Sequence, residues 1–190
     1  MVAVTLGILL TGIAVTSVRA RFEAQARRTA NHLTATFRYL YTRAATEART
    51  YRLAIDLEKQ TYWIERGSGT ALIETAPASA PPSRLTNQAD EGESYDRAPA
   101  EGAFGPAPNL PRALAQPGVM PSKVRFQEIY TSAGPEPVTT GMAYIHFFPQ
   151  GYAEPAIVNL TDLEGTRFIA LEVNPLTGFT RVYREHRGRK

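Results

Sequence analysis

The chain begins with eighteen residues, MVAVTLGILLTGIAVTSV, that carry no charge, and four arginines follow within the next ten positions. Apart from three threonines and one serine the stretch is apolar on every side, so it is not an amphipathic surface helix. A secretory signal peptide would carry positive charge before its apolar core, whereas here the arginines follow it. An 18-residue helix is about 27 Å long, close to the hydrocarbon thickness of about 30 Å in a bilayer. Residues 1–18 are therefore predicted to be a transmembrane helix.

Residues 19–50 are predicted to continue this helix as an amphipathic segment. No proline occurs before Pro77, and apolar residues recur at spacings of three and four, as on one face of an α-helix. The combined helix approaches fifty residues, far more than the roughly three or four turns usual in globular proteins, so its second half needs a surface to pack on. The face predicted to make this contact consists of Phe22, Ala26, Leu33, Phe37, Leu40 and Ala44.

From residue 51 onward the sequence alternates between apolar and polar residues. The run YRLAIDLEKQTYWIERGSG predicts a hairpin of two short strands, and TALIETA is a candidate third strand. Further strands are predicted in KVRFQEIYT, GMAYIHFFPQG, PAIVNLTD, RFIALEVNP and GFTRVYRE, of which the last four are expected to form an antiparallel meander. Residues 51–190 are thus predicted to be a β-rich globular domain, and the fold class is α+β.

Residues 75–121 differ from the rest of this domain. They hold nine of the fourteen prolines, which would interrupt strands. We expect an extended, partly ordered insertion in which LPRALAQPG is a candidate for one helical turn.

The sequence contains no recognisable catalytic or metal site. It has no cysteine, which excludes disulfides, thiolate metal ligands and cysteine nucleophiles. His32, His146 and His186 lack the spacing of metal ligands, and His146 is expected to be structural because it lies within an apolar strand. Trp63 is predicted to lie in either the core or an interface. No cofactor is predicted.

The acidic residues are also interpreted as structural. Asp56, Glu58 and Glu65 lie near each other on the hairpin, where a solvated strand edge is favoured over a catalytic carboxylate pair. Asp162 and Glu164 flank a turn, and the preference of acidic residues for turns explains their presence without a catalytic role. The protein is therefore predicted not to be an enzyme.

Charge is distributed unevenly along the chain. Eight arginines against two glutamates give residues 19–52 a net charge of +6, residues 53–180 sum to −7, and residues 181–190 carry +4. The basic C-terminus is expected to be a solvated tail. A second hypothesis is contact with nucleic-acid phosphates or an acidic partner through Arg184, Arg187, Arg189 and Lys190.

The order of these features resembles the GspH/FimT-type pseudopilin family of bacterial type II secretion systems and type IV pili. The resemblance covers the chain outside the proline-rich insertion. In that family an uncharged helix continues into an amphipathic one and enters a strand, as ATEARTYRLAIDLEKQTYWIE does here. Two later turn motifs match Phe147/Phe148–Pro149–Gly151 and Val173, Pro175, Thr177 and Gly178.

The resemblance implies a pilin-like fold, with one long N-terminal helix on antiparallel sheets, and a non-enzymatic role. The chain would be a minor pseudopilin at or near the tip of the type II secretion pseudopilus, supporting export of folded proteins across the outer membrane. It would be a single-pass inner-membrane protein with a periplasmic domain. Its partners would be membrane lipid before assembly and other major and minor pseudopilins afterwards. The alternative is a FimT-like minor type IV pilin that binds DNA through its basic tail for uptake.

One departure concerns the N-terminus. The family begins with a leader ending in glycine, then a phenylalanine and, four residues on, a glutamate, none of which is present here. The mature helix is therefore expected to have up to about two further turns at its front. The visible sequence alone would place the arginines after Val18 in the cytoplasm by the positive-inside rule, whereas the family places the globular part in the periplasm. Gly7 and Gly12 are compatible with close helix packing.

Overall fold

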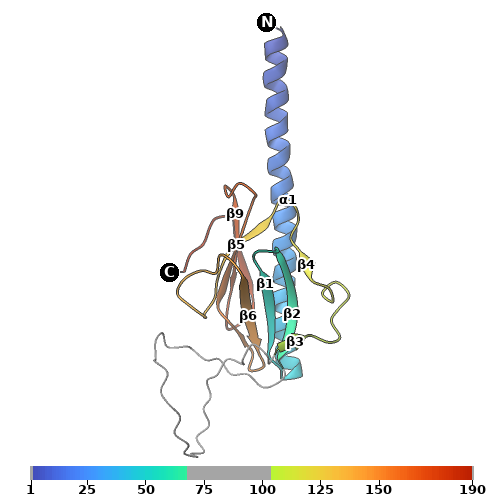
Figure 1. Ribbon diagram of the computed structural model, residues 1–190, viewed down its shortest axis with the longest axis vertical. Coiled ribbons are helices and arrows are strands. Elements are labelled where there is room, and N and C mark those ends of the chain that lie inside the picture. Colours follow the sequence, from blue (N-terminus) through green and yellow to red (C-terminus); the bar gives the residue numbers. More distant parts are fainter. Residues whose placement is uncertain (1, 68–103, 190) are drawn as a thin grey trace, which may run out of the picture.

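The computed structural model describes residues 2–67 and 104–189, with side chains from residue 22 onward. In this part of the chain one helix, α1 (Val2–Glu47), runs along two antiparallel sheets, and its first half projects beyond them (Figure 1). The side chains of the predicted transmembrane segment lie outside the described residues. Among the side chains that are described, no helical stretch is long and apolar enough to cross a membrane. The α+β fold class is confirmed.

The first sheet, sheet A, is built around the predicted hairpin. Its strands, in spatial order, are β3 (Phe104–Pro106), β2 (Thr61–Gly67), β1 (Tyr51–Asp56), β6 (Met142–Phe148) and β7 (Tyr152–Ala153), and β4 (Gly118–Val119) also pairs with β2. In the hairpin Leu53 lies opposite Ile64 and Ile55 opposite Tyr62. Since β1 pairs with β2 on one side and β6 on the other, it is a central strand.

The second sheet, sheet B, contains the C-terminal strands. Its order is β10 (Thr180–Tyr183), β9 (Phe168–Val173), β8 (Ala156–Thr161) and β5 (Arg125–Tyr130). The predicted four-strand meander is therefore correct only for β8, β9 and β10. The run GMAYIHFFPQG forms β6, which belongs to sheet A, because the chain turns at Pro149–Gly151 and crosses to sheet B after β7.

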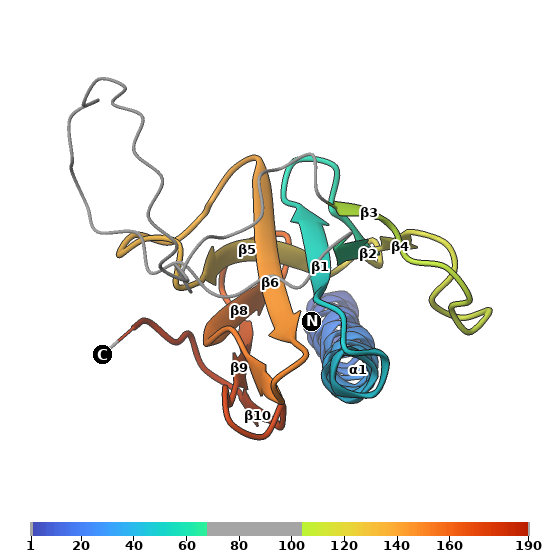
Figure 2. The ribbon, with the colours of Figure 1, turned by 90° about the horizontal axis from the view of Figure 1, so that it is seen from below.

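Helix α1 packs its apolar face against strands of both sheets. It contacts β1 and β6 of sheet A and β9 and β10 of sheet B, and Figure 2 shows the helix end-on beside β1. The rings of Phe37 and Phe147 lie 6.0 Å apart at the centre of this interface. Burial of each such large apolar side chain contributes about 1.5–3 kcal/mol, so this interface is a main source of stability.

The two sheets are also joined by a polar side chain at the turn of the hairpin. Gln60 has a φ of 55°, and its side chain donates to the carbonyl of Phe126 at 3.1 Å and accepts from the Phe126 amide at 2.7 Å. Because Phe126 lies in β5, this pair of bonds fixes sheet A to the start of sheet B.

The described part of the proline-rich insertion differs from the expectation that prolines would exclude strands. Two short strands, β3 and β4, pair with the outer edge of β2. Proline is compatible with edge strands, where no further ladder bond is needed, and Pro106 ends β3. The amide of Leu114 donates to the carbonyl of Pro111 at 2.7 Å, forming a single turn. The candidate strand TALIETA lies outside the described residues.

Candidate functional site

The predicted helix face lies at the junction of α1 with the sheets. Each of the six residues is at most 3% exposed, and Ala30 lies in the same core. The alanines on this face bring the helix backbone close to the strands, while the larger side chains fill the space between the two sheets. The six residues are Phe22, Ala26, Leu33, Phe37, Leu40 and Ala44.

Tyr41 connects this helix to two turns of the sheets. Its hydroxyl lies 2.6 Å from the carbonyl oxygen of Gly151 and 2.8 Å from that of Leu176. Gly178 packs directly on the ring, since an added Cβ would lie 2.6 Å from Cδ2 and 2.7 Å from Cβ of Tyr41. The two glycine-containing turn motifs singled out in the sequence therefore meet at one side chain of α1.

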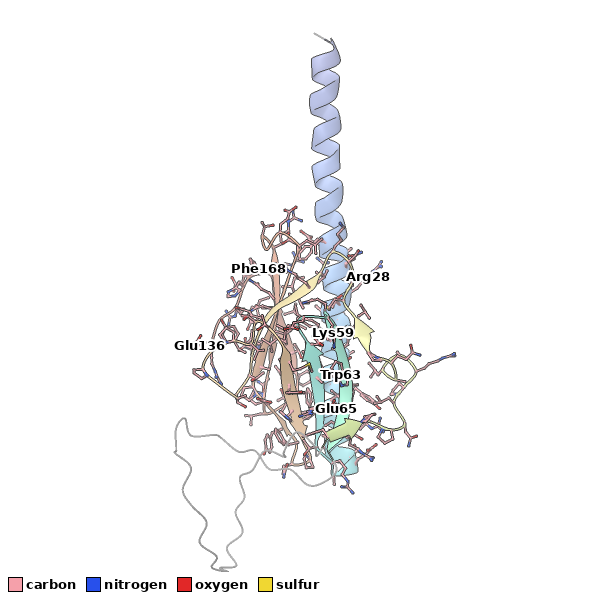
Figure 3. All side chains as sticks on the ribbon, in the orientation of Figure 1. Arg28, Lys59, Trp63, Glu65, Glu136 and Phe168 are labelled. Atoms are coloured by element: carbon pink, nitrogen blue, oxygen red, sulfur yellow. The ribbon has the colours of Figure 1, made fainter. Side chains whose placement is uncertain are left out.

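The acidic residues of the hairpin do not form a solvated edge. Glu65 accepts from Arg52 Nε at 2.6 Å and from Trp63 Nε1 at 2.8 Å, and the Arg52 guanidinium lies 4.0 Å from the ring centres of Phe104 and Tyr144. The expectation of solvation was wrong for Glu65 because β1, which carries Arg52, is a central strand whose polar face is covered. Figure 3 shows Trp63 and Glu65 side by side on β2.

Asp56 has a different role from Glu65. Its carboxylate accepts backbone N–H bonds from Lys59 at 2.9 Å and Glu58 at 3.0 Å, and these bonds lower the pKa of Asp56, with that of Lys59 contributing most. Glu58 is exposed. The three carboxylates thus do not form a shared catalytic pair.

His146 faces a buried carboxylate that the sequence analysis did not identify. Its Nδ1 lies 2.7 Å from Glu154 Oε2, and the backbone N–H and hydroxyl of Ser132 donate to Oε1 at 2.9 and 2.6 Å. Burial raises the pKa of Glu154, but the hydrogen bonds from His146 and Ser132 outweigh it and hold the pKa below its usual value. This cluster joins β6 to the segments that flank sheet B.

The C-terminal tail is largely exposed, as expected, but it is tied to sheet B at Arg187. The side chain of Asn159 donates to the carbonyl of Arg187 at 2.7 Å and accepts from its amide at 3.2 Å. His186 is hydrogen-bonded to Glu128, and Arg187 lies 3.5 Å from Glu172. Asn159 is fully buried. Its side chain pairs with both backbone groups of Arg187, as the backbone of a neighbouring strand would.

The four basic tail residues proposed to contact phosphates are not gathered into one site. Arg187 is paired with acidic neighbours, and Arg189 donates to the carbonyl of Gly134 at 2.9 Å. Arg184 lies in a different pocket from Arg187 and Arg189. Lys190 lies outside the described residues. The tail therefore presents less free positive charge than its sequence indicates.

The remaining candidate residues also have structural surroundings. The His32 ring lies 6.2 Å from that of Tyr62. Within residues 22–67 and 104–189, no three His, Asp or Glu side chains are placed to hold a metal ion.

Comparisons with known proteins agree with this architecture. No protein-family model matches the chain, and no curated protein sequence matches it significantly. Among solved structures, it is similar to the minor pseudopilin EpsH from the Type 2 Secretion System of Vibrio cholerae, with a TM-score of 0.51 and 9% sequence identity. The match covers 84% of this chain and 97% of that chain. At this identity the similarity shows the fold, which is pilin-like.

Proposed function

We propose that this chain is a minor pseudopilin of the GspH type, a non-enzymatic structural subunit at or near the tip of a type II secretion pseudopilus. The observation that carries the proposal is the division of α1 into two halves. One face of the second half is buried by the globular domain, whereas the first half projects beyond it (Figure 1) and has an uncharged sequence up to Val18. An uncharged helix that projects from a domain would expose apolar surface to water. The first half of α1 therefore needs an apolar environment other than the core of the domain.

Two environments fit the projecting half. Before assembly it would lie in the inner membrane as a single span, with the globular domain in the periplasm. After assembly it would pack against the helices of other major and minor pseudopilins, which an uncharged surface with small residues permits. The filament would then support export of folded proteins across the outer membrane.

The anchoring step is tested by Leu10→Lys, which places a charge at the middle of residues 1–18. A lysine at the centre of a transmembrane helix costs about 3 kcal/mol, so the variant should no longer co-fractionate with membranes while the globular domain keeps its melting temperature. Equal membrane association of the variant and the wild type would contradict a transmembrane role.

The cellular role is tested by deleting the gene in the bacterium that encodes it. Loss of folded proteins from the culture medium, restored by the wild-type chain but not by Leu10→Lys, would support the pseudopilin assignment. Normal secretion together with loss of DNA uptake would instead favour the FimT-like alternative.

A further inference from the structure

A basic pocket lies where α1 leaves the sheets. It has a volume of about 260 Å³, and Arg27 of α1, Arg167 before β9 and Arg184 after β10 contribute to its wall. Phe22 and Glu23 from α1 also line it. Figure 3 shows Phe168, the first residue of β9, at this end of the domain. We refer to the site as the basic pocket.

The loop that carries Arg167 is held in place by Asp162. Its carboxylate accepts from the amide and the hydroxyl of Thr166, both at 2.8 Å, and from the Arg167 amide at 3.3 Å. The guanidinium of Arg167 lies 6.0 Å from the ring centre of Phe22. Arg167 is therefore positioned towards the helix before any ligand binds.

The arginines of the basic pocket are available for an anion. Within the described part of the chain, Arg27, Arg167 and Arg184 form no ion pair, and Glu23 is the acidic residue that lines the pocket beside them. Arg167 also interacts electrostatically with the Asp162 carboxylate, so three guanidinium groups near two carboxylates, Glu23 and Asp162, leave one excess positive charge. Guanidinium groups bind phosphate oxygens through paired hydrogen bonds, so a phosphate group is the ligand chemistry that fits.

The position of the pocket along α1 indicates the source of the phosphate. Arg27 follows the uncharged segment by nine residues, which is about 14 Å along a helix. Helical side chains tilt towards the N-terminus, and arginine can extend its charged end back to a membrane surface. In the same loop as Arg167, Leu163 is 55% exposed, which suits the boundary between headgroups and acyl chains.

We propose that the basic pocket binds the phosphate of an anionic phospholipid headgroup and thereby seats the globular domain on the bilayer that holds α1. The proposal rests on the part of the proposed function in which residues 1–18 form a membrane anchor. Seating the domain in this way fixes its orientation before assembly, since the helix and the pocket together define two points of contact with the membrane.

The test uses the full chain in nanodiscs made of phosphatidylcholine alone or of phosphatidylcholine with phosphatidylglycerol. Amide hydrogen exchange is measured by mass spectrometry for segments 162–168 and 181–186. Both segments should exchange more slowly in the anionic discs. A cationic residue near an anionic surface changes binding about fivefold, so Arg167→Ala with Arg184→Ala should weaken docking about 25-fold and abolish the difference.

Two further variants test whether the loss of protection comes from the pocket itself, and not from a change in net charge or in folding. Arg112→Ala with Arg181→Ala removes the same charge at exposed positions outside the pocket and should keep the lipid-dependent protection. Arg27→Gln changes an exposed helix residue, so it should reduce the protection without altering the fold. Equal loss of protection in the control pair would overturn the proposal.

The remaining outcomes distinguish failure of this proposal from failure of the proposed function. If the chain does not remain with either kind of disc, the membrane anchor fails and both proposals fall. If it remains with both and exchange is identical in the two lipids, only the headgroup site is overturned. If inorganic phosphate or duplex DNA gave equal protection in phosphatidylcholine discs, the lipid headgroup proposal would be wrong and that compound would be the ligand of the pocket.

Discussion

Gly178 and Ala48 occupy backbone conformations that decide how α1 meets the sheets. Gly178 has a φ of 65° and lies against the Tyr41 ring. The position therefore requires both the left-handed backbone conformation and the absence of a Cβ atom. Ala48, directly after α1, has a φ of 50° although it carries a Cβ. The left-handed region costs an alanine about 1–2 kcal/mol relative to the usual helical region. Replacing Gly178 by alanine should therefore lower the stability of the fold, whereas replacing Ala48 by glycine should raise it.

Gly178→Ala is expected to destabilise the protein by about 2–4 kcal/mol, because backbone strain adds to a collision with Tyr41. Denaturant unfolding measures the change. Gly165→Ala is the matched control, since Gly165 has a φ of 69° but no atom within 4 Å of an added Cβ. It should cost only about 1–2 kcal/mol. Equal costs at the two sites would show that the contact with Tyr41 is unimportant.

Ala48→Gly is expected to stabilise the protein by about 0.5–1 kcal/mol, because glycine adopts a positive φ without strain and is the preferred residue after a helix. The comparison variant is Ala45→Gly, at an exposed position within the last turn of α1. There glycine should lower stability by about 1 kcal/mol. Thermal melts of both variants test the pair, and a lower melting temperature for Ala48→Gly would contradict the prediction.

At the level of elements, α1 and the crossing from β6 to β8 hold the two sheets together. The helix does so through apolar packing against strands of both. The crossing does so through Glu154, which bonds to His146 of β6 and to Ser132 beyond β5. The first interaction is independent of pH, whereas the second depends on an ionised carboxylate.

Phe37→Asp or Leu40→Asp should lower the free energy of unfolding by more than about 3 kcal/mol, because each places an unpaired charge in a fully buried position. The measurement is a thermal melt of the full chain in detergent. Ala35→Asp introduces the same charge at an exposed position of α1 and should cost only the difference in helix propensity, about 0.7 kcal/mol. Unchanged melting of the first two variants would mean that this face does not pack on the sheets.

Glu154 makes the stability depend on pH in the acid range. Its pKa is lower in the folded protein than its usual value of 4.5, so its contribution is complete above that value and is lost as the pH falls through the folded pKa. Glu154→Gln should cost about 1–3 kcal/mol at pH 7 and flatten the decline in stability below pH 4.5. A decline as steep as that of the wild type would assign the effect to other carboxylates, such as Asp162.

For the whole molecule, the charge distribution favours protein contacts and a lipid surface over DNA. The tail arginines Arg187 and Arg189 are engaged within sheet B and its neighbouring loop, and residues 53–180 carry a net charge of −7. An acidic body repels nucleic-acid phosphates, whereas the arginines of the basic pocket are at the end next to the uncharged helix.

Titration with duplex DNA at two salt concentrations tests this expectation. The full chain should bind DNA weakly near physiological salt, because Arg187 is ion-paired and the net charge of −7 on residues 53–180 repels phosphates. The comparison variant changes Arg184, Arg187, Arg189 and Lys190 to alanine. Micromolar binding by the wild type that falls steeply with salt and is absent in this variant would favour the DNA-uptake alternative.

Local periodicity in the sequence determined much of the architecture. The spacing of Phe22, Phe37 and Ala44 predicted one side of a helix, and all three are buried. The alternation around Leu53 predicted the β1–β2 hairpin, which the register confirms. These features were predictable because the periods of 3.6 and 2.0 residues follow from the backbone geometry of each element alone.

Tertiary structure decided which strands are neighbours and which polar groups are buried. The sequence of β6 does not specify whether it pairs with β1 or β8, since its apolar residues indicate a buried strand but not which strand lies beside it. Glu65 and Glu154 look like solvated carboxylates until the fold supplies Arg52 and His146 as partners. The tail residue Arg187 looks free until Asn159 of β8 binds its backbone. Each of these outcomes depends on residues distant in the chain, whose proximity only the folded molecule establishes.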